Sequence, residues 1–307
     1  MNKQEIDIHG ASFAYRERGH GEPMVLVHAN LSDMRSWEAI EPLLADHFRV
    51  ITYSRRFAYP NRPPDDGAHD ALTQHAEDLI ALVERLHLGK VHLVGNSSGA
   101  FICLLAAQLR PDLVRSLTLE EPPVVSMFLQ ALPPKPGELL KLLFTSPGTM
   151  LEFIKFGAGV IGPATKAFQQ GNDGAALDIF ARGVLGAAAF AKVTPARKQQ
   201  MSDNVAAHRA TMLGAGLPVF TAAQAAAIET PTLLICGAET PIFQRRINER
   251  LAEVIPEAKE ICIPNASHLV HEDNPQAVAE VIRTFCKSRD EVAFGAWSHA
   301  SAGAGSA

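Results

Sequence analysis

The 307-residue chain lacks the features of several large protein classes. Its net charge is −5, and no run of lysine or arginine is longer than two residues, as at 55–56. A surface that binds nucleic acid is therefore not expected. The most apolar long segment, 174–193, is interrupted by charged residues and falls short of a membrane span. The N-terminus reaches acidic residues before any apolar run, unlike a signal peptide. We therefore expect a cytoplasmic protein without a nucleic-acid or membrane partner.

Cysteine is also scarce, and its placement argues against a metal or redox motif. The four cysteines occur singly in apolar patterns, with no C-x-x-C spacing and no adjacent histidine set. We expect buried thiols and no metal site. The residues concerned are Cys103, Cys236, Cys262 and Cys286.

Hydrophobic residues make up 47% of the chain and charged residues 20%, which is ordinary for a globular enzyme. Apolar runs of strand length alternate with segments of helical period, which predicts an α/β fold with a mostly parallel sheet covered on both faces. A short antiparallel hairpin is expected before them, at 6–16. The clearest strands are at 24–28, 48–53 and 91–95, and the clearest helices at 37–46, 72–88 and 98–109.

The alternation stops near residue 123, after a strand at 116–119, and resumes with a strand at 232–236. The sequence between is helical in character and punctuated by proline and glycine. We therefore expect an α/β core from 1–122 and 231–288, with 123–230 as a helical lid. The segment 289–307 ends in alanine, glycine and serine and is expected to be a flexible C-terminal tail.

The candidate nucleophile is Ser97, in a segment at 95–99 that reads G-N-S-S-G. A predicted strand precedes it and a predicted helix follows, which is the context that gives this short motif its meaning. Gly95 and Gly99 would permit a sharp turn, and the helix N-terminus would offer N–H groups to an oxyanion. The alternative is a phosphate-binding turn, but neither G-x-G-x-x-G nor G-K-[ST] is present.

With this turn, the chain resembles the α/β-hydrolase superfamily over about 6–288. The resemblance implies an eight-stranded, mostly parallel sheet with a helical lid inserted after strand 6, and no cofactor. It also implies an oxyanion hole from the backbone N–H groups of Asn30 and Ser98. The family has glycine where this sequence has Ala29. His28 is expected to hold the turn rather than carry protons.

A histidine suits the role of base because its pKa lies near neutrality. His268 lies after the last predicted strand, in a loop similar to the histidine loop of the family. His271, three residues further on, is the alternative. In the loop after the fourth strand, which contains Arg55 and Arg56, an arginine could clamp a substrate carboxylate, although a role in tying loops together is favoured.

Three glutamates are candidates for the acid that would orient the histidine. Most of the superfamily has an aspartate after strand 7, where this sequence has Thr240, with Glu239 one residue earlier. Glu120 and Glu121 follow strand 6, an arrangement that resembles certain lactonases and dehalogenases. Strand alternation sends these two side chains to opposite sides and favours Glu121; Glu239 and Glu120 remain alternatives.

These residues together predict a serine hydrolase that cleaves a carboxylic ester or lactone with an apolar substituent through an acyl-enzyme on Ser97. A C–C bond hydrolase and a cofactor-free haloperoxidase-like enzyme remain alternatives, as does a ligand-binding receptor on the same scaffold. The expected partner is a small apolar ester or lactone, and a homodimer is left open.

Overall fold

A computed structural model describes residues 3–65, 67–129 and 135–287, so the expected tail at 289–307 lies outside the described residues. Its centre is an eight-stranded sheet in the order β1-β2-β4-β3-β5-β6-β7-β8. Only β2 pairs in the antiparallel sense, with β1 and β4, and the other pairs are parallel. The strands are β1 (Gln4–Ile8), β2 (Ala11–Arg18), β3 (Glu22–Val27), β4 (Phe48–Tyr53), β5 (Val91–Asn96), β6 (Val114–Glu120), β7 (Thr232–Gly237) and β8 (Lys259–Ile263).

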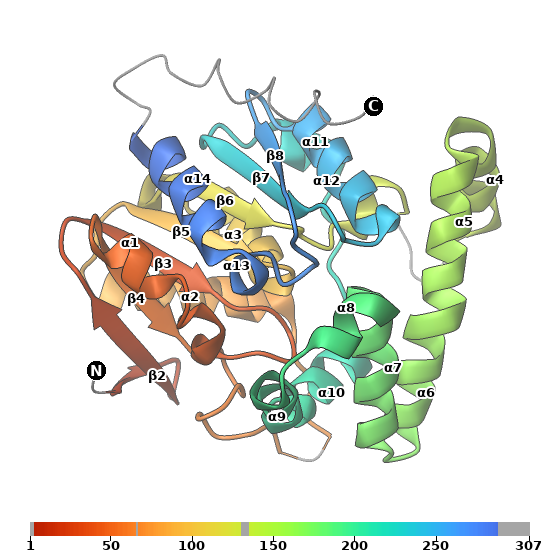
Figure 1. Ribbon diagram of the computed structural model, residues 1–307, viewed down its shortest axis with the longest axis horizontal. Coiled ribbons are helices and arrows are strands. Elements are labelled where there is room, and N and C mark those ends of the chain that lie inside the picture. The colour runs from red at the N-terminus through yellow and green to blue at the C-terminus, as the bar shows by residue number, and fades with distance from the viewer. Residues whose placement is uncertain (1–2, 66, 130–134, 288–307) are drawn as a thin grey trace.

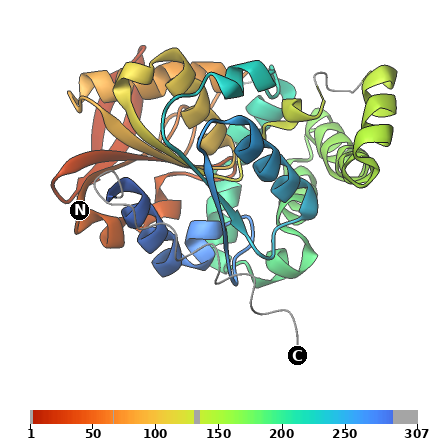
Figure 2. The same ribbon diagram turned by 90° about the horizontal axis from the view of Figure 1, so that it is seen from above.

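Helices cover both faces of the sheet (Figures 1 and 2). One hydrophobic cluster joins the sheet to α2 (Leu72–Arg85), α3 (Ser98–Leu109) and α12 (Ile242–Val254). A second cluster joins the opposite face to α1 (Glu41–Ala45), α13 (Val270–Asp273) and α14 (Pro275–Lys287). Every residue of β5 and β7 is buried, as expected for strands covered on both sides.

The segment between β6 and β7 contains no strand among its described residues and is built from helices (Figure 1). Most of them lie to one side of the sheet, where α4 and α5 are the farthest from it, whereas α11 lies beside α12 (Figures 1 and 2). No helix in the described parts of the chain is both long and apolar enough to cross a membrane. The helices are α4 (Pro136–Thr145), α5 (Pro147–Phe156), α6 (Gly162–Gln169), α7 (Asp173–Leu185), α8 (Ala187–Lys192), α9 (Pro195–Asp203), α10 (Val205–Leu213) and α11 (Ala222–Ala226), with a π-helical turn at Gly157–Ile161 and a short 3-10 turn at Val125–Met127. Another 3-10 turn, Pro111–Leu113, lies before β6.

Two local expectations differ from the structure. The helix expected at 37–46 is split into a 3-10 turn at Met34–Trp37 and the short α1, because Pro42 lies in the first turn of a new helix. Cys262 was expected to be buried but is exposed, whereas the other three cysteines are buried. The reason is that β8 is the last strand of the sheet, and the sequence pattern does not distinguish an edge strand from a central one.

Candidate active site

Ser97 lies at the sharp turn between β5 and α3. Its φ of 51° and ψ of −120° are in a region that residues other than glycine rarely adopt. A Cβ on Gly99 would lie 2.1 Å from the carbonyl oxygen of Val27, and one on Gly95 would lie 2.6 Å from the backbone of Gly99. The backbone N–H of Ser97 donates to the carbonyl of Glu120 at 2.7 Å. Close packing of three strands and a helix therefore holds the serine in a strained conformation.

Glu121, after β6, and His268, after β8, are brought together from 147 residues apart. The Nδ1 of His268 lies 2.5 Å from Oε2 of Glu121, and both side chains are at most 5% exposed. A carboxylate only accepts hydrogen bonds, so Nδ1 carries the proton and Nε2 is left free to act as a base. The backbone N–H of Gly237 donates to the other oxygen, Oε1, at 2.8 Å. These contacts fix the orientation of both members of the pair.

Glu120 and His271, the alternative acid and the alternative base, pair with each other. The Nδ1 of His271 lies 2.6 Å from Oε2 of Glu120, and neither side chain is more than 1% exposed. The ring of His271 stacks on Trp37 with centroids 3.8 Å apart. Trp37 belongs to the hydrophobic cluster under α1 and α14. The two consecutive glutamates therefore contact two different histidines.

Glu239, the remaining alternative acid, lies at the surface. Its carboxylate is 3.4 Å from Nζ of Lys192, and its side chain is 46% exposed. Its backbone N–H donates to the carbonyl of Ala266 at 2.8 Å, so the chain passes close to the histidine loop while the side chain points elsewhere. Thr240, at the position of the usual aspartate, is buried.

Asn30 and Ser98, the expected oxyanion donors, are adjacent. The hydroxyl of Ser98 donates to Oδ1 of Asn30 at 3.0 Å. Nη2 of Arg55 donates to the same oxygen at 2.9 Å and to the carbonyl of Ala29 at 3.1 Å. Ser98 is the first residue of α3, a position at which the backbone N–H has no partner within the helix. Arg55 thus ties the loop that carries Asn30 in place by polar contacts.

His28 is fully enclosed beneath this loop. Its Nε2 accepts the backbone N–H of Arg55 at 2.9 Å, so Nδ1 carries the proton and donates to the carbonyl of Ala29 at 2.8 Å. Burial and the nearby charge of Arg55 lower the pKa of His28 well below its usual value. A neutral imidazole with both nitrogens engaged holds the turn, as expected, rather than moving protons.

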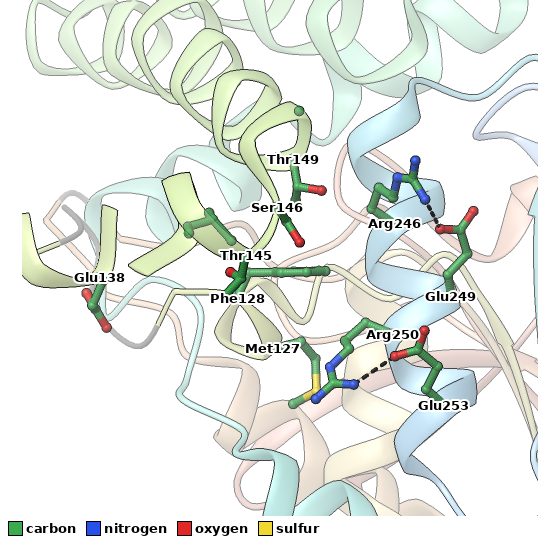
Figure 3. A pocket seen from close by; sticks show the side chains of 12 residues that line it. Met127, Phe128, Glu138, Thr145, Ser146, Thr149, Arg246, Glu249, Arg250 and Glu253 are labelled. Atoms are coloured by element: carbon green, nitrogen blue, oxygen red, sulfur yellow. Dashed lines mark hydrogen bonds and ion pairs between the residues drawn. The ribbon is translucent and has the colours of Figure 1, made fainter. Parts of the chain in front are cut away.

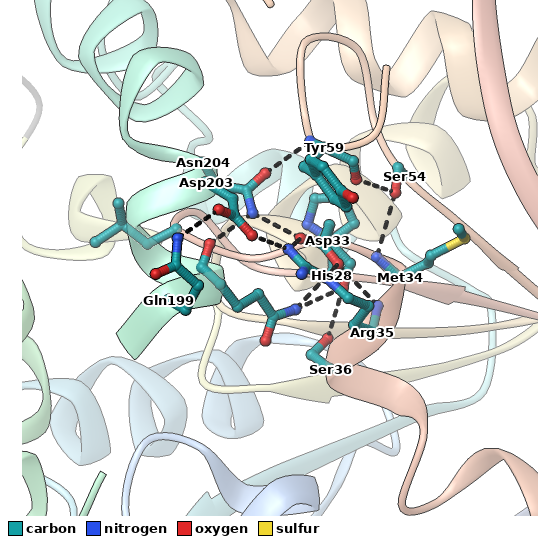
Figure 4. Close-up of polar contacts among 12 residues, drawn as sticks. His28, Asp33, Met34, Arg35, Ser36, Ser54, Tyr59, Gln199, Asp203 and Asn204 are labelled. Carbon is teal, nitrogen blue, oxygen red and sulfur yellow. Dashed lines mark hydrogen bonds and ion pairs between the residues drawn. The ribbon is translucent and has the colours of Figure 1, made fainter. Parts of the chain in front are cut away.

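A buried carboxylate, Asp33, links the loop after β3 to the helices that follow β6 (Figure 4). It accepts hydrogen bonds from Nη2 of Arg35 at 2.6 Å and from Nδ2 of Asn204 at 2.7 Å. Asn204 in turn accepts the backbone N–H of Tyr59 at 2.8 Å. Sequence reasoning missed this network because its members are up to 171 residues apart and share no motif. It fastens α9 to the loop that carries Asn30.

Asp33→Asn is expected to lower the free energy of unfolding by about 2 kcal/mol near pH 7. The amide cannot form the charge-assisted hydrogen bonds of the carboxylate, and its NH2 group would face the N–H donors of Arg35 and Asn204. Burial raises the pKa of Asp33, but hydrogen bonds from Arg35 and Asn204 outweigh it, so the pKa is lowered from 3.8. The stabilisation is therefore complete above the unfolded pKa and is lost as pH falls through the lower folded value. Urea unfolding at about pH 7 and about pH 3 should show the difference shrinking in acid; an equal difference at both would contradict the argument. Asp178→Asn, in an exposed pair with Arg182, is the control.

A cavity of about 700 Å³ lies between the sheet and the helices that follow β6. Ser97, Glu121 and His268 lie on its wall, together with Asn30 and Ser98. No group of three or more side chains that could hold a metal ion occurs among the residues that the structure describes. The wall is mostly apolar on the helical side, where it is formed by Leu129, Phe153, Phe156, Phe180, Leu185 and Met201 among others.

A second groove, of about 740 Å³, lies between α4, α5 and α12 (Figure 3). On α12, Arg246 donates to Glu249 at 2.8 Å and Arg250 donates to Glu253 at 2.7 Å. The described residues that line it include no histidine and none of the candidate catalytic side chains. The groove is therefore separate from the candidate site.

This sheet order, with a strained serine turn after the fifth strand, defines an α/β protein of the hydrolase type. Residues 22–275 match the family model for the alpha/beta hydrolase fold, and the chain belongs to that family. The predicted fold class is confirmed.

Individual relatives share part of the sequence or the fold. The chain is 31% identical to a 2-hydroxy-6-oxo-6-(2'-aminophenyl)hexa-2,4-dienoic acid hydrolase of Metapseudomonas resinovorans, over 37% of this chain and 40% of that protein. It is 34% identical to karrikin insensitive 2 receptor B of Petunia hybrida, over 33% of this chain and 38% of that protein. These matches thus span about two fifths of either relative. A thermophilic esterase from Thermogutta terrifontis superposes with a TM-score of 0.71 at 22% identity, covering 93% of this chain and 98% of that one.

Proposed function

We propose that the protein hydrolyses a carboxylic ester or lactone with an apolar substituent, in two steps through an acyl-enzyme on Ser97. The observation that most directly supports this proposal is the buried Glu121–His268 pair, which lies on the same cavity wall as the strained Ser97. Nε2 of His268 takes the proton of the Ser97 hydroxyl as it attacks the carbonyl carbon, and returns it to the leaving alkoxide. Water, activated by the same nitrogen, then releases the acid.

The backbone N–H groups of Asn30 and Ser98 are proposed to bind the oxyanion of each tetrahedral intermediate. Both residues lie on the cavity wall beside Ser97, and Ser98 opens α3, where the helix dipole favours negative charge. The helices between β6 and β7 would act as the lid that gives the cavity its apolar side. Since α9 is fastened through Asp33, that part of the lid is proposed to be a fixed wall.

The charges in the cavity favour a neutral substrate over an acidic one. Arg197 is the one arginine among the described lining residues, and its Nε donates to Glu272 at 2.9 Å while Nη1 donates to the carbonyl of Leu31 at 2.8 Å. Arg55 is occupied by the oxyanion loop and is not on the wall. A substrate carboxylate would therefore meet no unengaged arginine there, whereas an alkyl or aryl group would meet apolar side chains.

A fluorophosphonate probe followed by intact mass tests the nucleophile. One adduct is expected on the wild type and none on Ser97→Ala, because the probe bonds only to an activated hydroxyl. Ser98→Ala is the matched control and should still be labelled, since its proposed contribution is the backbone N–H. An unlabelled wild type, or an adduct that survives in Ser97→Ala, would count against the proposal. A panel of p-nitrophenyl esters and lactones, with neutral and acid-bearing members of equal size, then tests the preference for neutral substrates.

A further inference from the structure

Two of the four cysteines are direct neighbours across the last pair of strands. Cys236 on β7 and Cys262 on β8 are register partners in parallel pairing. Residues at equal register project to the same face of a sheet, and adjacent strands lie about 4.8 Å apart. A disulfide needs Cα atoms about 4.4–6.8 Å apart, so the two positions are within bridging range, but it also needs Cβ atoms about 3.5–4.5 Å apart, so closing the bridge would draw β7 and β8 together at this pair.

The two thiols differ in environment, which gives them different chemical roles. Cys262 is exposed on the edge strand, whereas Cys236 is buried. A hydrogen bond from the Cys236 thiol lowers the pKa of Cys262, and the charge of Arg245 on α12 adds to this against the effect of burial. The same hydrogen bond and burial raise the pKa of Cys236. The accessible sulfur is thus the better thiolate, and the enclosed one lies beside it.

The other two cysteines provide an internal contrast. Cys103 and Cys286 are buried in the two hydrophobic clusters, one on each face of the sheet. Burial raises the pKa of both thiols. A reagent that reacts with accessible thiolates should therefore distinguish Cys262 from these two.

The cysteine pair adjoins the candidate acid. Cys236 precedes Gly237, whose N–H donates to Oε1 of Glu121 at 2.8 Å. A Cβ on Gly237 would lie 2.4 Å from the carbonyl oxygens of Ala266 and Ser267, so the end of β7 packs directly against the histidine loop. A change in the backbone at Cys236 would be transmitted to both partners of the Glu121–His268 pair.

We propose that Cys236 and Cys262 form a modification site, a dithiol that hydrogen peroxide oxidises to a disulfide, and that oxidation lowers hydrolase activity by moving Gly237 away from Glu121. The Cys262 thiolate attacks a peroxide oxygen, the O–O bond breaks, and the sulfenic acid forms with release of hydroxide, which takes up a proton. The Cys236 thiol then attacks that sulfur, loses its proton, and expels the oxygen as water. The two sulfurs together lose two electrons and the peroxide gains them. Formation of the disulfide is independent of the proposed function; the loss of activity rests on it.

Oxidation of the intact reduced protein with hydrogen peroxide, followed by alkylation after unfolding and peptide mass analysis, tests the site. A cross-linked Cys236–Cys262 peptide, lighter by two hydrogen atoms than its reduced parts, is expected, while Cys103 and Cys286 stay alkylatable. Ester hydrolysis should fall in step with the cross-link and return with dithiothreitol. Over-oxidation of Cys262 without a cross-link, or alkylatable thiols at all four positions, would overturn the proposal.

Two variants separate a specific effect from general damage. Cys262→Ser should retain the basal activity and lose its sensitivity to peroxide, whereas Cys286→Ser should remain sensitive and still form the cross-link. Inhibition of Cys262→Ser equal to that of the wild type would overturn the link to activity. The cross-link is read by mass alone, so a protein that fails to hydrolyse esters but forms it would refute the proposed function and not the dithiol site.

Discussion

Glu121→Gln is expected to lower kcat by about 10⁴-fold with little change in KM, because it reverses the tautomer of His268. The N–H of Gly237 needs an acceptor at the position of Oε1, so the amide oxygen takes that place. The amide NH2 then faces Nδ1 of His268, where the carboxylate oxygen lies 2.5 Å away in the wild type. Nδ1 must become an acceptor, the ring proton moves to Nε2, and the base can no longer accept the proton of Ser97.

Steady-state kinetics on one ester substrate checks this effect, with Glu239→Gln as the matched control. The carboxylate of Glu239 lies in an exposed pair with Lys192, and its removal should leave kcat near the wild-type value. If the kcat of Glu239→Gln fell steeply while Glu121→Gln kept nearly the wild-type kcat, the assignment of the acid would be refuted. Fluorophosphonate labelling of Glu121→Gln should be slow and should still occur at Ser97.

His271→Leu is expected to lower the free energy of unfolding by about 3–5 kcal/mol, because it leaves the carboxylate of Glu120 buried without its partner. Glu120 has no exposed side-chain surface, and the hydrogen bond to His271 at 2.6 Å is the contact that compensates its charge. Trp37, stacked on the ring, would also lose its neighbour.

The double variant Glu120→Leu with His271→Leu separates the pair from simple loss of packing. Removing both polar groups abolishes the unpaired charge, so much of the lost stability should return. Urea unfolding of the two single variants and the double variant gives the coupling energy. Equal losses in the double and the His271→Leu variants would show that no buried charge was left unpaired.

The candidate nucleophile could be identified from sequence because its motif is local. The segment at 95–99 carries the glycines that the turn requires, and the flanking strand and helix have their own periodic patterns. The structure gives a physical reason for each glycine, since a Cβ at either would overlap backbone atoms. The alternation of strands and helices likewise predicted the sheet and the long helical segment after β6.

The candidate acid could not be chosen from the sequence alone. Sequence reasoning favoured Glu121 and left Glu239 and Glu120 open, since the choice depends on side chains that approach from distant parts of the chain. Glu121 has a φ of 49°, a left-handed conformation that simple strand alternation does not anticipate. That turn directs Glu121 towards His268, while Glu120 keeps the orientation of the strand and contacts His271. The same limit explains Cys262, whose exposure depends on β8 being an edge strand.

The sequence by itself determined the succession of strands and helices along the chain, the serine turn and the histidine loop, because periodicity and turn chemistry act over a few neighbouring residues. Only the tertiary structure decided which glutamate meets which histidine, which loops Arg55 and Asp33 hold, and which two cysteines become neighbours. Those pairings join residues from 25 to 171 positions apart. They follow from strand order, register and burial, quantities that exist only once the whole sheet has formed.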